Sequence, residues 1–261
     1  SARGGAPAAA IDWWATFPPE PLAGLVVAHG AFQLLLDGHL SAVAPADRAP
    51  DLARLARATE PGPSGSTLEA ALPAKLAEEL RRRAVLPDRF YREVARREAA
   101  NRPEAMALYL PAIDLLAEGW IGGDVALADL VRAELEEADR LIGGLMEGFG
   151  TLVVVLDPGR RRGGMGRMGR EGRVLFAHPA PDPRAVCRGG ADLQVAPEAV
   201  AAALIRALGL PQSAELPEPP GFCSWPEPPA RVSGFGERSP GGELPGDSRD
   251  YLENLRSLGY L

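Results

Sequence analysis

Hydrophobic and polar positions follow two kinds of pattern along this chain. Apolar residues recur at helical spacing through residues 125–146, a pattern typical of an amphipathic helix. An unbroken run of β-branched or apolar residues follows at 151–155, bounded by glycine before it and by Asp-Pro-Gly after it. Such a short bounded run is typical of a strand that is buried on both faces of a parallel sheet.

The same two patterns recur elsewhere and predict the fold class. Short apolar runs indicate strands at 25–27, 106–110 and 173–177, and helical spacing indicates helices at 68–83, 91–100 and 196–208. Residues 44–66, rich in Ala, Pro, Gly and Ser, are expected to form a surface excursion. Alternating strands and helices predict an α/β fold with a mostly parallel central sheet and helices on both faces. We expect 107–110, 152–155 and 174–177 to be neighbours in that sheet, with helix 125–146 over one face.

Composition shifts divide the chain into three expected parts. Residues 1–210 form an α/β domain, which we expect to be incomplete at its N-terminus. Residues 211–246 are dominated by Pro, Gly, Glu and Ser and predict an extended arm with little regular structure. Residues 247–261 place leucines on one side of a short C-terminal helix.

Charge and cysteine content narrow the function classes. The net charge of -7 argues against a general nucleic-acid binder. The two cysteines, Cys187 and Cys223, make neither a disulfide framework nor a metal cluster, so they do not indicate a compartment. No apolar run is long enough to span a bilayer, and we expect no transmembrane segment.

Three acidic residues follow predicted strands, where α/β folds bind ligands. Asp114 and Glu118 come after the strand at 106–110, on a loop or first helical turn, and Asp157 ends the strand at 151–155. They could form an oxygen-rich site for magnesium or calcium. The favoured interpretation is that the two aspartates are turn and cap residues. His29, at the end of the strand at 25–27, could be a ligand, although a lone histidine there is more often structural.

Arginines cluster among glycines in residues 160–172. They could contact an anion or an acidic protein partner, or lie in a solvated loop. The acidic chain and the absence of interleaved aromatic residues favour the loop or a protein partner over nucleic acid. The candidate contact residues are Arg160, Arg161, Arg162, Arg167 and Arg170.

Several segments together resemble a known family. In order and spacing, they are similar to the type I phosphodiesterase/nucleotide pyrophosphatase branch of the alkaline phosphatase superfamily. Members of that family hold two divalent ions, usually zinc, with Asp and His side chains, and a Thr or Ser nucleophile attacks phosphorus. The resemblance implies an alkaline-phosphatase-like fold. The segments are WWATFPPEPLAGLVV, LPAKLAEELR, ALYLPAID, TLVVVLDPG, GRVLFAHPAP, VAPEAVAAALIRALGLP and LENLRSLGYL.

The family's metal-site pattern is degenerate here. Glu118 stands where the family has a histidine four residues after its aspartate, which corresponds to Asp114. Pro158 replaces the histidine of the family's Asp-His-Gly, and residues 165–171 contain no histidine. All three histidines, His29, His39 and His178, lie elsewhere. The family's nucleophile and first ligand belong to an N-terminal strand and helix that this sequence does not contain.

These departures predict a protein without the family's chemistry. We expect no catalytic residues, no bound metal and no cofactor. The expected function is that of a pseudoenzyme domain acting as a structural or accessory subunit, with other protein subunits as partners and no small-molecule substrate. One alternative is a metal-dependent phosphodiesterase or phosphatase completed by a separate N-terminal chain. Another is a module that binds phosphate or a nucleotide without turnover.

Overall fold

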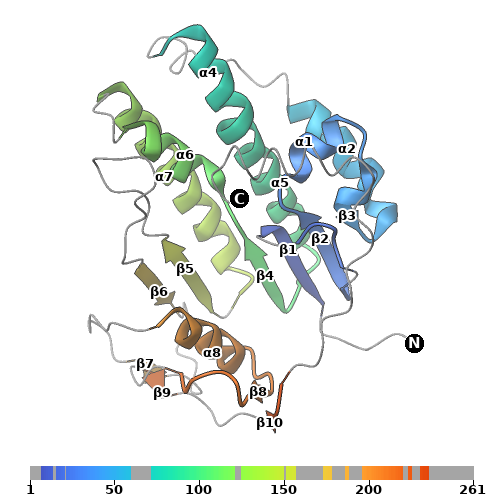
Figure 1. The fold of residues 1–261 in the computed structure, drawn as a ribbon, viewed down its shortest axis with the longest axis vertical. Coiled ribbons are helices and arrows are strands. Elements are labelled where there is room, and N and C mark those ends of the chain that lie inside the picture. The colour runs from blue at the N-terminus through green and yellow to red at the C-terminus, as the bar shows by residue number, and fades with distance from the viewer. Residues whose placement is uncertain are drawn as a thin grey trace. The chain divides into compact units, whose positions relative to one another are not determined.

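A computed structural model describes eleven stretches of the chain, which fall into two compact units (Figure 1). The described residues up to Leu145 belong to the first unit, and those from Met146 onward to the second. The stretches are 7–13, 16–20, 22–59, 72–120, 125–149, 151–156, 173–177, 186–187, 196–219, 223–224 and 230–234.

The first unit contains a mixed four-stranded sheet in the order β3-β2-β1-β4. Its strands are β1 (Ala8–Trp13), β2 (Gly24–Ala28), β3 (Val43–Ala44) and β4 (Ala105–Leu108). β1 runs parallel to both β2 and β4, whereas β3 pairs antiparallel with β2. The α/β class is therefore confirmed, but the sheet is mixed rather than the mostly parallel one that was predicted.

Helices make up most of the rest of the first unit. α2 contradicts the expected surface excursion at 44–66, because its Leu52, Ala53 and Ala56 are buried. α6 shows that Asp114 and Glu118 lie in a regular helix. The elements are α1 (Ala31–Leu36), η1 (Leu40–Ala42), η2 (Ala46–Arg48), α2 (Ala49–Thr59), α4 (Ala74–Leu80), the π-helical η3 (Arg81–Val85), α5 (Leu86–Ala99), α6 (Pro111–Trp120) and α7 (Val125–Met146).

Two hydrophobic clusters hold this unit together. The larger packs alternate residues of β1 and β2 against α1, α2 and α5, with Phe32, Phe90 and Tyr91 as its aromatic members. Side chains two apart in a strand share one face, which explains why Ile11, Leu25 and their neighbours face these helices. The smaller cluster joins α4, η3, α6 and α7. None of the helices in the described stretches combines the length and apolarity that a membrane span needs.

The second unit corrects the expected sheet. β5 (Leu152–Leu156) and β6 (Arg173–Ala177) are strands, as predicted, but they pair antiparallel in a two-stranded sheet separate from that of β4. Val155 and Leu156 are exposed, so the prediction of a strand buried on both faces is wrong. A five-residue apolar run fixes the extended backbone but not the strand partner, because pairing depends on residues distant in sequence.

The rest of the second unit consists of one helix and short strand pairs. α8 (Pro197–Ala207) ends before Gly209, whose φ of 65° suits a residue without a Cβ. β7 (Val186–Cys187) pairs antiparallel with β9 (Cys223–Ser224), and β8 (Gln212–Ser213) pairs parallel with β10 (Arg231–Val232). Residues 211–246, the predicted arm, thus contain short strands where they are described, and residues 247–261 lie outside the described residues. The domain boundaries at 210 and 246 stay predictions.

Candidate functional site

The order of the parallel strands places a candidate site at one edge of the sheet. From the central β1 the chain first adds β2 on one side and later β4 on the other. The carboxyl ends of strands that diverge in this way leave a crevice, which is where α/β proteins bind ligands. A cavity of about 430 Å³ opens at this edge. Asp12, His29 and Tyr109, which lie at or just beyond the ends of β1, β2 and β4, all line it.

A backbone irregularity in β1 directs the Asp12 side chain into the protein interior. The β1–β2 register shifts between Ile11 and Trp13, and Asp12 has a φ of 54°, in the left-handed region that Asp tolerates better than most residues. Bulges of this kind bend a strand and re-aim a side chain. The residue is 1% exposed. The end of β1 therefore delivers a buried carboxyl group to the floor of the cavity.

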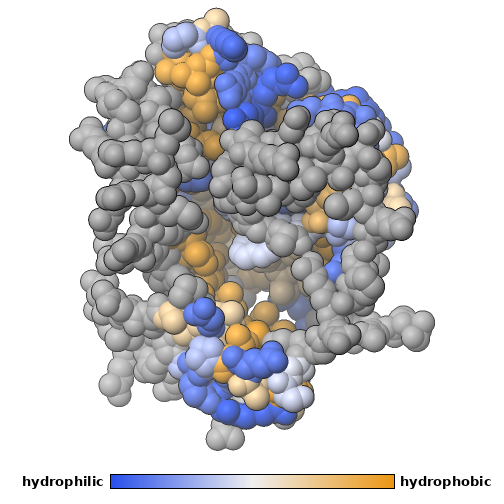
Figure 2. Space-filling view, in the orientation of Figure 1, coloured by the Kyte–Doolittle hydropathy of each residue, from blue (hydrophilic) through white to orange (hydrophobic). Residues whose placement is uncertain are grey.

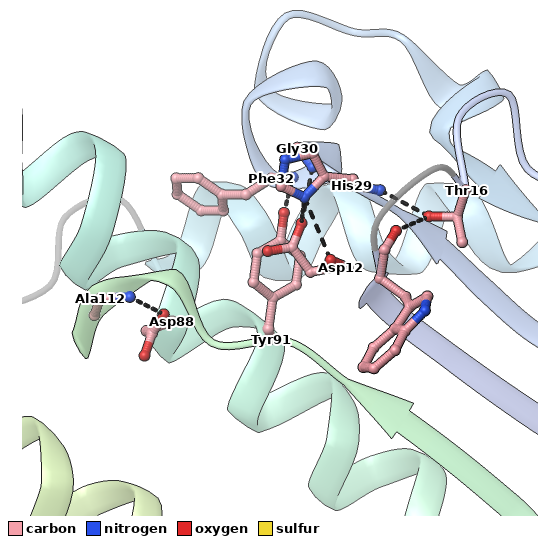
Figure 3. A network of polar contacts seen from close by, with 9 residues as sticks. Asp12, Thr16, His29, Gly30, Phe32, Asp88, Tyr91 and Ala112 are labelled. Carbon is pink, nitrogen blue, oxygen red and sulfur yellow. Dashed lines mark hydrogen bonds and ion pairs between the residues drawn. The ribbon is translucent and has the colours of Figure 1, made fainter. Parts of the chain in front are cut away.

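Three groups converge on the Asp12 carboxyl (Figure 3). Its Oδ1 accepts a hydrogen bond from the Gly30 N–H at 2.8 Å and lies 3.1 Å from Nδ1 of His29. The Tyr91 hydroxyl is also hydrogen-bonded to Asp12, and it accepts the Phe32 N–H at 3.1 Å. This network ties the end of β1 to the start of α1 and to α5.

The electrostatics of the Asp12–His29 pair favour retention of a proton. Burial raises the pKa of the Asp12 carboxyl, although His29 counteracts part of this shift. Burial alone would lower the pKa of the His29 imidazole, but the hydrogen bonds and the Coulombic attraction to Asp12 together outweigh burial and raise that pKa. Burial also keeps the pKa of Tyr91 well above its ordinary value, so the hydroxyl stays protonated and can donate to Asp12.

The Asp12–His29 pair holds the imidazole ring of His29 in one orientation. The His29 N–H donates to Thr16 Oγ1 at 3.1 Å, which fixes the backbone, while Asp12 fixes the ring through Nδ1. The His29 side chain is 11% exposed and that of Asp12 only 2%, so the imidazole is the member nearer to the solvent. An imidazole held in this way can exchange protons or hydrogen-bond a ligand.

A second buried network positions α6 beside the cavity. Asp88 Oδ1 accepts the Ala112 N–H at 2.9 Å, at the start of α6, and its Oδ2 accepts from Arg92 at 2.9 Å. Arg92 also pairs with Glu134 of α7. Burial raises the pKa of Asp88 to about 7, against the lowering effect of Arg92. The Asp88 carboxyl thus links α5, α6 and, through Arg92, α7.

Charged side chains from α4 and η3 contribute another part of the cavity lining. Lys75, Arg82 and Arg83 lie there with Glu78 and Glu79. Figure 2 shows a strongly hydrophilic area over α4, next to hydrophobic atoms. The cavity wall itself is mostly apolar and includes Phe32, Pro87, Tyr109, Pro111 and Leu115. The site therefore combines an apolar wall, a buried polar floor and charges of both signs.

The structure tests the predicted site residues only in part. Asp114 lies on α6 and lines the same cavity as His29, a proximity that the sequence did not predict. Glu118 follows one helical turn later, and its side chain is not described. Among the described residues no group of three His, Cys, Asp or Glu side chains could hold a metal ion. Asp157, Pro158 and the five candidate arginines, Arg160, Arg161, Arg162, Arg167 and Arg170, lie outside the described residues, as does His178. His39 immediately precedes η1 and is exposed.

Two residues of the network were missed by the sequence analysis. Asp12 closes the apolar run AAAI, and a polar residue ending such a run is a signal for the carboxyl edge of a sheet. The helix predicted at 91–100 begins with Tyr91, whereas α5 begins earlier, at Leu86, and Tyr91 is 1% exposed. The apolar spacing of Leu86, Phe90 and Val94 indicates the buried face that carries it.

Comparison with known proteins adds no family assignment. The resemblance to the alkaline phosphatase superfamily therefore rests on the sequence segments alone. No protein-family model, curated protein or solved structure matches this chain.

Proposed function

We propose that this chain is a non-catalytic, alkaline-phosphatase-like domain that acts as an accessory subunit of a larger protein assembly. The ordered set of family-like segments supports the proposal, and the α/β class of the structure is compatible with it. The proposal includes the finer fold of that family, with helices on both faces of the sheet. The observation that carries it is the chemistry of two ligand positions, where Glu118 and Pro158 stand in place of histidines.

These replacements bear directly on metal binding. Imidazole nitrogen is a good zinc ligand, whereas proline offers no side-chain donor atom. A two-metal site must hold both ions to activate a nucleophile and to stabilise the transferring phosphoryl group. At the described edge of the sheet, the imidazole of His29 is bound through Nδ1 to the buried Asp12, and no group of three His, Cys, Asp or Glu side chains among the described residues could hold a metal ion. The loss of ligands therefore favours a role other than hydrolysis.

Metal analysis combined with an activity assay tests the absence of chemistry. Purified protein is assayed for bound zinc, and a chromogenic phosphodiester is supplied with zinc, manganese or magnesium. We expect no stoichiometric zinc pair and no turnover above background. Glu118→His and the double variant with Pro158→His should stay inactive, because residues 165–171 offer no histidine for the family's third ligand position. Two zinc ions per chain, or turnover that disappears in Asp157→Ala, would refute the pseudoenzyme and favour an enzyme completed by a separate chain.

The accessory role needs its own measurement. Native mass spectrometry and size-exclusion chromatography of material from the natural source should show the chain bound to other protein subunits. The arginines between 160 and 170 are the proposed contact with an acidic partner. A free monomer in that material would contradict the subunit role.

A second candidate function is a binding module without turnover. The cavity at the carboxyl edge favours it, because the volume of about 430 Å³ lies within the usual range for small-molecule sites. This candidate is compatible with a degenerate catalytic site, since ligand binding needs neither a nucleophile nor metal ions.

A further inference from the structure

The charges that line the cavity are unequally engaged. Glu78 forms two hydrogen bonds with Arg81, at 2.8 and 2.9 Å, and Glu79 binds Arg83 at 3.0 Å. Among the described residues, no ion pair or hydrogen bond holds Lys75 or Arg82, although both line the cavity. Lys75 is thus available to an anion. Arg82 attracts Glu78 through its charge and helps to lower the pKa of that carboxyl, but its guanidinium hydrogen-bond donors stay available, whereas Glu78 and Glu79 already bind Arg81 and Arg83.

The π-helical segment η3 supports a functional role for these cations. π-Helical turns are rare, because their wide backbone packs less well than an α-helix, and they occur frequently at functional sites. η3 spans Arg81–Val85 within an otherwise continuous run of helix between α4 and α5. Ala84 and Val85 are buried in the smaller hydrophobic cluster, while Arg82 and Arg83 line the cavity. The wide turn thus presents arginines to the cavity while the same five residues contribute to the core.

The apolar wall and the balance of charges restrict the ligand. Four acidic and three basic side chains line the cavity, so a polyphosphate or another highly charged anion would meet repulsion as well as attraction. The mostly apolar wall suits a compound with an aromatic or branched aliphatic body. The acidic residues are Asp12, Glu78, Glu79 and Asp114, and the basic ones are Lys75, Arg82 and Arg83.

We propose that this cavity binds a small amphipathic anion, with an apolar body and one carboxylate or phosphate-like group. Lys75 and Arg82 receive the negative group, and the imidazole of His29, held by Asp12, supplies a hydrogen bond from the floor. The aromatic and proline side chains of the wall cover the body of the ligand. This inference deepens the binding-module candidate and does not depend on the accessory-subunit role.

Probe compounds separate the charge of the ligand from its apolar body. Phenylphosphonate and phenylacetate carry both features, inorganic phosphate carries only the charge, and benzyl alcohol carries only the body. Titration calorimetry on the full chain should show saturable binding of at least one of the first two, weaker or no binding of the last two, and an affinity that falls with added salt. The stronger of the first two distinguishes a phosphate-like ligand from a carboxylate. None of the probes requires turnover, so a hydrolytic activity would refute the pseudoenzyme without affecting this test.

Single substitutions test which side chains of the cavity bind the probe. Arg82→Gln should weaken binding of the amphipathic probe about tenfold, as for loss of a charge-assisted hydrogen bond. Arg97→Gln is the matched control, because Arg97 is exposed, pairs with Glu93 on α5 and does not line the cavity. Since His29→Gln could disturb the fold, imidazole chemical shifts in the unmodified chain provide a second readout, and they should move on titration with the probe. Equal losses in the two arginine variants, binding of benzyl alcohol as tight as that of the anions, or no saturable binding in the millimolar range would overturn the proposal.

Discussion

The Tyr91 hydroxyl is the most direct test of the buried network, because it can be removed without changing the shape of the core. In Tyr91→Phe the ring keeps its edge contact with Phe90, whose centroid lies 5.2 Å away. The Phe32 N–H loses its acceptor and the Asp12 carboxyl loses a donor. Both groups are buried, so no water replaces the lost partner without a rearrangement.

The expected cost follows from these two groups. An unsatisfied buried backbone N–H costs about 1–3 kcal/mol, and a hydrogen bond to a charged group contributes about 1.5–3 kcal/mol. The two effects share one hydroxyl and are not additive, so we expect a loss of about 2–4 kcal/mol in the free energy of local unfolding. Two compact units make a single global unfolding energy ambiguous. Hydrogen exchange at the Phe32 amide is therefore the assay, and it should accelerate by about thirtyfold or more.

Tyr109→Phe is the matched control for this measurement. Its ring lies 6.1 Å from the His29 ring between centroids, yet it is not the acceptor of the Phe32 N–H. Exchange at the Phe32 amide should stay unchanged in this control. If hydrogen exchange at the Phe32 amide accelerates by less than about threefold in Tyr91→Phe, the loss of local stability is below about 1 kcal/mol, and the network as described is refuted.

Three further predictions concern the backbone, the pH dependence and the cysteines. Gly24→Ala should lower the free energy of unfolding by more than about 3 kcal/mol, because its Cβ would lie 1.9 Å from the Ala8 carbonyl oxygen. Gly143→Ala is the control, since a Cβ there meets nothing within 4 Å. Circular dichroism that shows Gly24→Ala fully folded and as stable as this control would contradict the prediction. The Asp88 pKa of about 7 lies above its ordinary 3.8, so the native state binds this proton more tightly than the unfolded state does. The resulting stability is present below about pH 4 and is lost as the pH rises through 7. The unfolding free energy of the first unit, which contains Asp88, should therefore decrease by about 2–3 kcal/mol between about pH 5 and pH 8 when the urea transition of that unit is followed. Asp88→Asn should flatten this decrease, and an unchanged slope would contradict the shift. Cys187 and Cys223 are opposite partners in the β7–β9 register, and this backbone spacing suits a disulfide. Oxidation by a small disulfide reagent should therefore cross-link residues 187 and 223 within one chain. Peptide mapping that finds only intermolecular links would contradict the register.

The sequence by itself determined the elements whose signal is local. The strands at 25–27, 152–155 and 173–177 occur where short apolar runs predict them, and the helices at 125–146 and 196–208 occur where helical spacing predicts them. In the strands the apolar side chains follow one another without interruption, and in the helices they recur every three to four residues, so the backbone conformation depends on residues close together in the sequence. The alternation of such segments also predicted the α/β class.

Tertiary structure decided how these elements pair and which residues meet. The run at 152–155 looks the same whether its partner is parallel or antiparallel, and only the contact with β6 settles the pairing. The bond between Tyr91 and the Phe32 amide spans 59 residues, and the one between Asp12 and Gly30 spans 18. No local pattern encodes such distances, because the packing of α5 against β1 and α1 brings these groups together. The apolar pattern therefore determined where strands and helices form, whereas the buried polar contacts at the edge of the sheet depended on long-range packing.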